Sequence, residues 1–151
     1  MKRLIFFFTL AVLLVLDTSA QVILKVRYPA VELINKDVLK DMKDVKTFFI
    51  TTQQEFDTYF KLTDASTIDF STQIVLVAMV GGKEADNFIS INAARYLPDG
   101  RYFWIRYDIE EKAKGTCGKY CVATVQKMEY RKIKFLKGSK YTNRDSIMDG
   151  N

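Results

Sequence analysis

The run of consecutive apolar residues at positions 74–80, Ile-Val-Leu-Val-Ala-Met-Val, is the strongest constraint on the fold of this chain. Side chains in a β-strand alternate between the two faces of a sheet, so a strand built from this run is apolar on both faces. Such a pattern is typical of a central strand that other elements cover on both sides. The sequence must therefore supply apolar elements for each face of that strand.

The other apolar segments predict a mainly antiparallel sheet. Strand propensity and alternation indicate strands at residues 45–50, 74–80, 87–97, 101–109 and 122–135. Pro98-Asp99-Gly100 is a strong turn signal, so the strands on either side of it should form an antiparallel hairpin. Residues 21–44 add an N-terminal strand and a short helical segment, which Asn35 is suited to cap.

Thr52 and Glu55 form a capping box, in which a threonine is followed three residues later by a glutamate. This box predicts a helix over residues 53–61. The expected fold is therefore a single α+β domain, a mainly antiparallel β-sheet with one or two short helices packed on one face. The β-rich domain spans residues 45–137, and residues 138–151 are expected to form a polar flexible tail.

The last predicted strand changes its apolar phase. Its apolar positions are even-numbered at Met128 and Tyr130 but odd-numbered at Ile133 and Phe135. Since alternate residues of a strand share a face, a bulge or break near residues 131–132 would account for the change.

Two short motifs beside the apolar run predict turns. Asp69, in Asp-Phe-Ser, is expected to form an Asx-type turn or cap in which its carboxylate accepts hydrogen bonds from nearby backbone N–H groups. Gly81-Gly82-Lys83 lacks the spacing of a phosphate-binding loop and predicts a hairpin turn.

Residues 1–20 have the three-part layout of a secretory signal peptide. Lys2 and Arg3 give a positive start, and an almost unbroken apolar stretch follows over residues 4–16. We expect cleavage after Ala20 and export to the periplasm or the medium. The alternative is an uncleaved N-terminal anchor, which is disfavoured because the apolar stretch is shorter than the about 20 residues that cross a bilayer. No transmembrane segment is expected after signal removal.

The chain carries a formal net charge of +5, but acids and bases are mixed along most of it, as in residues 36–44. Mixed charges in an exported protein do not suit nucleic acid, and no nucleic-acid partner is expected. In residues 127–140, by contrast, basic residues predominate over acidic ones. This stretch is either a solvated strand face with a basic end or a surface that attracts anionic envelope polymers or lipid headgroups.

Histidine is absent from the sequence, which removes Ser-His and Cys-His nucleophile pairs, imidazole general bases and His-ligated metal centres. Asp108, Glu110 and Glu111 cluster at a predicted strand end, but Lys112 follows at once and no calcium-loop spacing is present. We favour a solvated, salt-bridged strand end over acid–base catalysis or calcium binding. No enzyme activity, no cofactor and no metal are expected.

Cys117 and Cys121 enclose a short segment that contains Gly118. In an exported protein such a nearby pair most often forms a disulfide, which is our prediction. Two free thiols are the alternative. A redox-active pair is disfavoured because three residues separate the cysteines instead of the usual two.

One stretch of the chain resembles a known family. It runs from the strand that ends at Ile50, through the capped helix, to Asp69-Phe70-Ser71 and the apolar strand, and then to Gly81-Gly82-Lys83 and the strand that begins at Phe88. This order resembles the C-terminal domain of the protease-complex subunit PrcB family, found in exported bacterial proteins. The resemblance covers roughly residues 45–110. It implies a small, exported, β-rich domain without known catalytic residues.

The hairpin over residues 87–109 presents a mixed face that is the candidate binding site. The candidate residues are Tyr96, Tyr102, Trp104, Arg106 and Asp108. The spacing of the turn predicts that Tyr96 and Tyr102 lie close together on this face. Tyrosine, tryptophan and arginine dominate the energy of many protein contacts. The alternative is that the helix at residues 53–61 covers this face.

The residues together favour an exported, non-catalytic protein-interaction module, an accessory or stabilising subunit of an envelope or secreted complex. Its expected partner is another exported protein. The alternative is a module that binds carbohydrate or polyanion of the cell envelope, including envelope polysaccharide, through Tyr96, Tyr102, Trp104 and the lysine-rich end.

Overall fold

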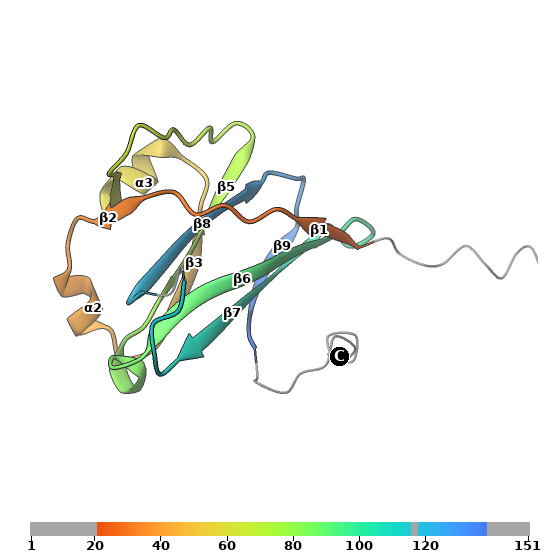
Figure 1. Cartoon of the computed structure of the whole chain (residues 1–151). Helices are drawn as coiled ribbons and strands as arrows, with labels where there is room; N and C mark the ends of the chain where they lie inside the picture. Colours follow the sequence, from red (N-terminus) through yellow and green to blue (C-terminus); the bar gives the residue numbers. More distant parts are fainter. Residues whose placement is uncertain (1–20, 116–117, 139–151) are drawn as a thin grey trace, which may run out of the picture.

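The computed structural model describes residues 21–115 and 118–138 (Figure 1). Its strands form a three-stranded central sheet, a four-stranded sheet and a two-stranded ribbon, and most strand pairs are antiparallel. Two short helices accompany them within the described residues. The expected α+β fold, a single small domain of mainly antiparallel sheet, is confirmed. No helix in the described ranges combines the length and the hydropathy that crossing a membrane requires.

The central sheet consists of β3 (Lys46–Ile50), β5 (Gln73–Met79) and β8 (Tyr120–Gln126), with β5 in the middle. Every residue of β5 after Gln73 is fully buried. Leu76 belongs to one hydrophobic cluster and its neighbour Val77 to another. The prediction that residues 74–80 form a central strand covered on both sides is confirmed.

The four-stranded sheet has the order β1 (Val22–Leu24), β6 (Phe88–Leu97), β7 (Tyr102–Glu110) and β9 (Lys132–Lys137). β6 and β7 form the predicted antiparallel hairpin, whereas β9 runs parallel to β7. One face of this sheet packs on the central sheet through Ile91, Phe103 and Ile105, all fully buried. The other face points away from this core and is called the outer face below.

The opposite face of the central sheet is covered by the helices and the ribbon. The helices are α2 (Asp37–Asp41) and α3 (Gln53–Tyr59), and the ribbon pairs β2 (Val31–Leu33) with β4 (Phe60–Leu62). Phe56 of α3 and Phe60 of β4 are buried against Val75 and Val77 of β5. Both helices therefore lie on one face, as predicted (Figure 1).

α3 begins as the capping box predicts, since the Thr52 Oγ1 atom accepts a hydrogen bond from Glu55 N at 3.2 Å. The helix ends at Tyr59, two residues before the predicted end. Phe60 has an extended backbone with φ −135° and ψ 156°, because residues 60–62 pair with β2. Near α2, the Asn35 side chain accepts a hydrogen bond from Asp37 N at 3.0 Å, which resembles the expected capping.

The predicted last strand is two strands that belong to different sheets. The chain leaves the central sheet after β8, crosses at residues 127–131 and enters the four-stranded sheet as β9. In this crossing, Tyr130 makes edge-to-face contacts with Phe49 and with Phe103, each at 5.8 Å between ring centroids. The predicted break is confirmed, and the change of apolar phase reflects the change of sheet.

Gly81 and Gly82 do not form a hairpin turn, and that prediction is wrong. β5 and β6 lie in different sheets, and the connection between them contains a 3-10 turn over Gly82–Glu84. Gly82 has φ +56°, and a Cβ there would collide with the backbone carbonyl of Lys43. Glycine is needed at this position because of both the positive φ and the close approach.

The N-terminal segment forms strand pairs or bridges with all three sheets. β1 pairs with β6, and β2 pairs with β4 beyond the central sheet. Between them, Arg27 and Thr124 of β8 exchange backbone hydrogen bonds of 3.0 and 2.7 Å. This contact closes the edge of β8 that faces away from β5.

Replacing Leu76 with alanine should destabilise the protein by about 2–5 kcal/mol, because it opens a cavity at a fully buried position of β5. Ile23→Ala is the control, since Ile23 is 77% exposed, and it should change stability by about 0.5 kcal/mol or less. Urea unfolding followed by circular dichroism measures both. Equal losses for the two variants would contradict the central role of β5.

Asp69 closes the turn that leads into β5. Its carboxylate accepts hydrogen bonds from Ser71 N at 2.9 Å, Ser71 Oγ at 2.5 Å and Thr72 Oγ1 at 2.9 Å. The predicted Asx-type turn is confirmed. The hydrogen bonds from the Ser71 and Thr72 side chains, followed by that from Ser71 N, lower the pKa of Asp69 below its ordinary value.

The lowered pKa of Asp69 predicts a pH dependence of stability. The unfolded chain holds this proton more tightly than the native protein does, so the stabilisation is complete above the unfolded pKa of about 3.9. It is lost as the pH falls through the lower native pKa. Asp69→Asn should therefore lose less stability than the unmodified protein between about pH 5 and pH 2. Glu111→Gln, the same charge change in an exposed loop, is the control for urea unfolding across this range.

Candidate functional site

The outer face of the four-stranded sheet bears four of the five predicted binding residues. Tyr102, Trp104, Arg106 and Asp108 alternate along β7 with the core residues Phe103 and Ile105. The alternative that the predicted helix covers this face is wrong, because Phe56 of α3 packs on the far side of the central sheet. No helix or strand within residues 21–115 and 118–138 is packed over the outer face.

Tyr96 does not belong to the outer face. It is buried with 6% of its surface exposed, its ring lies 5.2 Å from that of Phe103, and its hydroxyl donates to the Glu129 carbonyl at 2.6 Å. The reason is a β-bulge between Ile91 and Ala93, where one extra residue reverses the alternation of the rest of β6. The expected neighbour of Tyr102 is therefore replaced by Leu97.

The register of the four strands arranges the outer face in rows. One row crosses all four strands through Ile23, Arg95, Trp104 and Lys134. The rows on either side of it consist of Leu97, Tyr102 and Lys132, and of Ala93, Arg106 and Leu136. With about 4.8 Å between neighbouring strands, the four-residue row is about 14 Å long. Aromatic, aliphatic and cationic side chains thus share one small surface.

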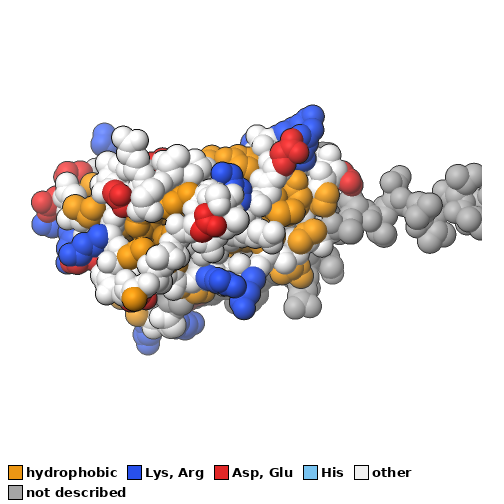
Figure 2. Space-filling view, turned by 90° about the horizontal axis from the view of Figure 1, so that it is seen from above, with side chains coloured by type: hydrophobic (Ala, Val, Ile, Leu, Met, Phe, Trp, Pro, Cys, Tyr) orange, Lys and Arg blue, Asp and Glu red, His pale blue; other side chains and the backbone are white. Residues whose placement is uncertain are grey.

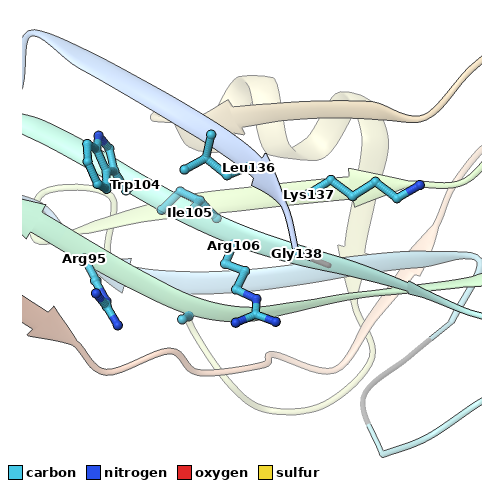
Figure 3. A pocket seen from close by; sticks show the side chains of 8 residues that line it. Arg95, Trp104, Ile105, Arg106, Leu136, Lys137 and Gly138 are labelled. Carbon is cyan, nitrogen blue, oxygen red and sulfur yellow. The ribbon is translucent and has the colours of Figure 1, made fainter. Parts of the chain in front are cut away.

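A pocket of about 90 Å³ lies between the row of Trp104 and the row of Arg106 (Figure 3). Trp104, Leu136 and the two arginines Arg95 and Arg106 supply its walls, and Ala93 leaves room between them. Lys137 also lines the pocket, but its side chain extends away from Trp104. The pocket therefore combines one indole, one aliphatic side chain and two guanidinium groups.

Arg106 lies at the end of a chain of polar side chains. Its Nε atom lies 3.5 Å from Asp108 Oδ1, and the Asn92 amide donates to the other oxygen of Asp108. Ser90 Oγ in turn donates to Asn92 Oδ1 at 3.0 Å. A Cβ at Gly138 would collide with both Asp108 and Arg106, so the glycine backbone lies directly against this ion pair. This ion pair lies along one wall of the pocket, and its facing atoms, Arg106 Nε and Asp108 Oδ1, are buried without a hydrogen bond to a described residue.

The positive charge of the outer face is not balanced by carboxylates in the described part of the chain. Arg95 donates from Nη1 to the neutral Gln21 side chain at 3.1 Å. Lys132 and Lys134 form no ion pair with another described residue. Among the described cations of the outer face, Arg106 alone has an acidic partner, Asp108, while the pocket-lining Lys137 pairs with Glu84 at 3.5 Å. The face as a whole is cationic.

Two of the three acids at the end of β7 form ion pairs with described residues. Lys114 Nζ lies 3.5 Å from Glu110, and Asp108 pairs with Arg106. The predicted salt bridge between this strand end and the lysines that follow it is present as Glu110–Lys114, whereas Asp108 pairs with Arg106 of the same strand. The described residues contain no group of three side chains suited to hold a metal ion.

Three carboxyl groups with a lowered pKa lie outside the pocket. The ammonium group of Lys61, with help from Lys36, lowers the pKa of Glu32. A hydrogen bond from the Ser66 hydroxyl lowers the pKa of Asp64, and a hydrogen bond from the Ser71 hydroxyl is the largest cause of the lowered pKa of Asp69. All three groups are exposed, and their hydrogen bonds stabilise local structure.

Three predictions concern residues that the structure does not describe. Cys121 is buried, and its Sγ atom accepts a hydrogen bond from Ile91 N at 3.3 Å. Cys117 lies outside the described residues, so the Cys117–Cys121 disulfide stays a prediction. The signal peptide at residues 1–20 and the tail beyond Gly138 lie outside them as well.

Several residues of the site were missed from the sequence. Uninterrupted alternation along residues 87–97 would place Arg95 on the face of Ile89 and Ile91, and the bulge before Ala93 moves it to the outer face. Leu136 carries a readable signal, since it is an apolar residue of opposite phase to Ile133 and Phe135 in a lysine-rich strand. Ile23 could not be placed, because only the pairing of β1 with β6 brings it beside Arg95.

A second hollow lies where the N-terminal segment crosses the central sheet. It has a volume of about 310 Å³ and is lined by Lys25, Arg27, Gln73 and Thr124, among other residues.

Figure 2 views the molecule from above, and the hydrophobic side chains there form separate patches. At the α2 end acidic and basic side chains lie beside each other in this view.

Comparisons of this chain with protein-family models, with curated proteins and with solved structures found no match. The resemblance to the PrcB family therefore stays a prediction.

Replacing Phe103 with alanine should destabilise the protein by about 3–5 kcal/mol, because this ring is fully buried between the sheets. Trp104→Phe, at the adjacent position on the outer face, should cost about 1 kcal/mol or less. Thermal unfolding of both variants tests the assignment of faces on β7. A larger loss for Trp104→Phe would show that the indole belongs to the core.

Proposed function

We propose that this chain is a non-catalytic interaction module that binds another exported protein through its outer face. The observation that supports the proposal is the row of Ile23, Arg95, Trp104 and Lys134, which lies on the outer face of the four-stranded sheet. Tyrosine, tryptophan and arginine supply most of the binding energy at many protein interfaces, and all three occur here.

The aliphatic residues at the edges of this surface favour a protein partner over a carbohydrate. Ile23 is 77% exposed and Leu136 is 37% exposed. Burial of such side chains against apolar groups of a partner is favourable because it removes apolar surface from water. A sugar stacks on aromatic rings but offers aliphatic side chains little apolar surface. Carbohydrate or polyanion binding is therefore the second candidate, which the cationic charge and Trp104 support.

The wider role remains that of an accessory or stabilising subunit of an envelope or secreted complex. The signal-peptide pattern of residues 1–20 and the resemblance to the PrcB family support this part of the proposal. A binding module of this kind acts through the protein to which it is bound.

Site-specific photo-crosslinking in the cells that produce the protein tests the proposal. A benzophenone amino acid at position 102 replaces an exposed tyrosine and lies beside the pocket residues. We expect irradiation to give one discrete adduct that protease digests and that mass spectrometry identifies as a protein.

The matched control places the same amino acid at Lys43, which lies exposed next to α2. This position should give no such adduct. An adduct that resists protease and yields sugars would replace the proposal with carbohydrate binding. The same protein adduct from both positions, or none from position 102, would contradict docking on the outer face.

A further inference from the structure

The pocket on the outer face has the chemistry of a site for a carboxylate with an apolar neighbour. Arg95 and Arg106 supply guanidinium groups, which bind carboxylates in fixed geometry. Trp104 and Leu136 supply apolar walls beside them. A ligand that fits this pocket therefore carries a negative charge and an apolar group next to each other.

The register places the two arginines close enough to share one anion. Arg95 is opposite Trp104, and Arg106 is two residues further along β7. The Cα atoms of such diagonal neighbours are about 7–8 Å apart, within reach of long side chains. Arg95 has only the neutral Gln21 as a hydrogen-bond partner among the described residues, so its positive charge is available to a ligand.

Two lysines near the pocket also favour a negatively charged ligand. Lys134 lies opposite Trp104 on β9, and Lys132 lies opposite Tyr102. Neither lysine pairs with a carboxylate in the residues described. A partner with several negative charges in a short stretch would complement these groups. Such charges would speed the association and fix the position in which the segment binds.

The size of the site favours a chain segment over a small cofactor or a broad interface. The pocket has a volume of about 90 Å³, whereas sites for cofactors and drug-sized ligands hold about 300–1,000 Å³. The row across the four strands is about 14 Å long, the length of about four extended residues. One side chain in the pocket and a few on either side would fill this surface.

We propose that the outer face binds an acidic, extended segment of the partner protein, with one of its carboxylates between Arg95 and Arg106. An adjacent apolar side chain of the segment packs on Trp104 and Leu136. This inference rests on the proposed function, since it names the part of the partner that docks. It commits to a peptide, and an acidic polysaccharide is the competing outcome of the test.

The chain offers an internal probe for this interaction, because Trp104 is its single tryptophan. Fluorescence of residues 21–151 would be titrated with the blocked pentapeptide Glu-Glu-Leu-Glu-Glu. Its neutral counterpart, Gln-Gln-Leu-Gln-Gln, has the same shape without the charge. We expect a saturable change with the acidic peptide that weakens as salt is added, and at least about tenfold weaker binding of the neutral one.

Arg95→Gln removes one guanidinium group that has no carboxylate partner in the described structure, and it should weaken binding of the acidic peptide about tenfold. Lys43→Gln makes the same charge change far from the pocket and should leave binding unchanged. Thermal unfolding checks that both variants fold. Equal binding of the two peptides, an equal effect of the two variants, or no saturable change at millimolar peptide would overturn the inference.

Two outcomes separate this inference from the proposed function. If the crosslink from position 102 still captures the protein partner in the Arg95→Gln background at full yield, the docking surface stands and the carboxylate site fails. If an oligogalacturonate binds in an Arg95-dependent way while the acidic peptide does not, both the peptide and the protein partner are replaced by an acidic polysaccharide.

Discussion

Burial of β5 on both faces is the constraint on which the rest of the structure depends. Leu76 and Val77 are neighbours in sequence, yet they contribute to two separate cores. Leaving either face in water would expose a row of apolar side chains, and covering them is the main favourable contribution to folding. The four-stranded sheet must therefore lie on one side of β5, and α3 with the β2–β4 ribbon on the other. The N-terminal segment joins these layers through β1, Arg27 and β2.

This arrangement explains why the candidate site lies on the four-stranded sheet. The central sheet uses both of its faces for packing, so it has none to present to a partner. Within the described residues the four-stranded sheet packs on one face, and its outer face bears Trp104, Arg95 and their neighbours. The strand register arranges its side chains in rows, and Arg106 pairs with Asp108, which accepts a hydrogen bond from Asn92. A prepared surface loses less conformational entropy when a partner binds.

Part of the site could be predicted because the alternation of outer-face and core residues along β7 can be read from that strand alone. Alternation along β7 separates Tyr102, Trp104, Arg106 and Asp108 from the core without any knowledge of the rest of the fold. The same reasoning failed for Tyr96, because the bulge before Ala93 adds one residue and reverses the faces. Nothing in the sequence around Asn92 marks that bulge. Its partner residues lie on β7, so the irregularity is a property of the pair of strands.

The sequence alone determined the local structure: the doubly apolar strand, the capped helix at Thr52, the turn at Asp69 and the hairpin around residues 98–100. Each of these depends on periodicity, or on hydrogen bonds between residues a few positions apart. Only the tertiary structure decided which strands share a sheet, that β9 runs parallel to β7, and that Ile23, Arg95 and Leu136 join Trp104. Strand pairing depends on contacts between residues far apart in the chain, and alternation within one strand carries no information about its neighbour.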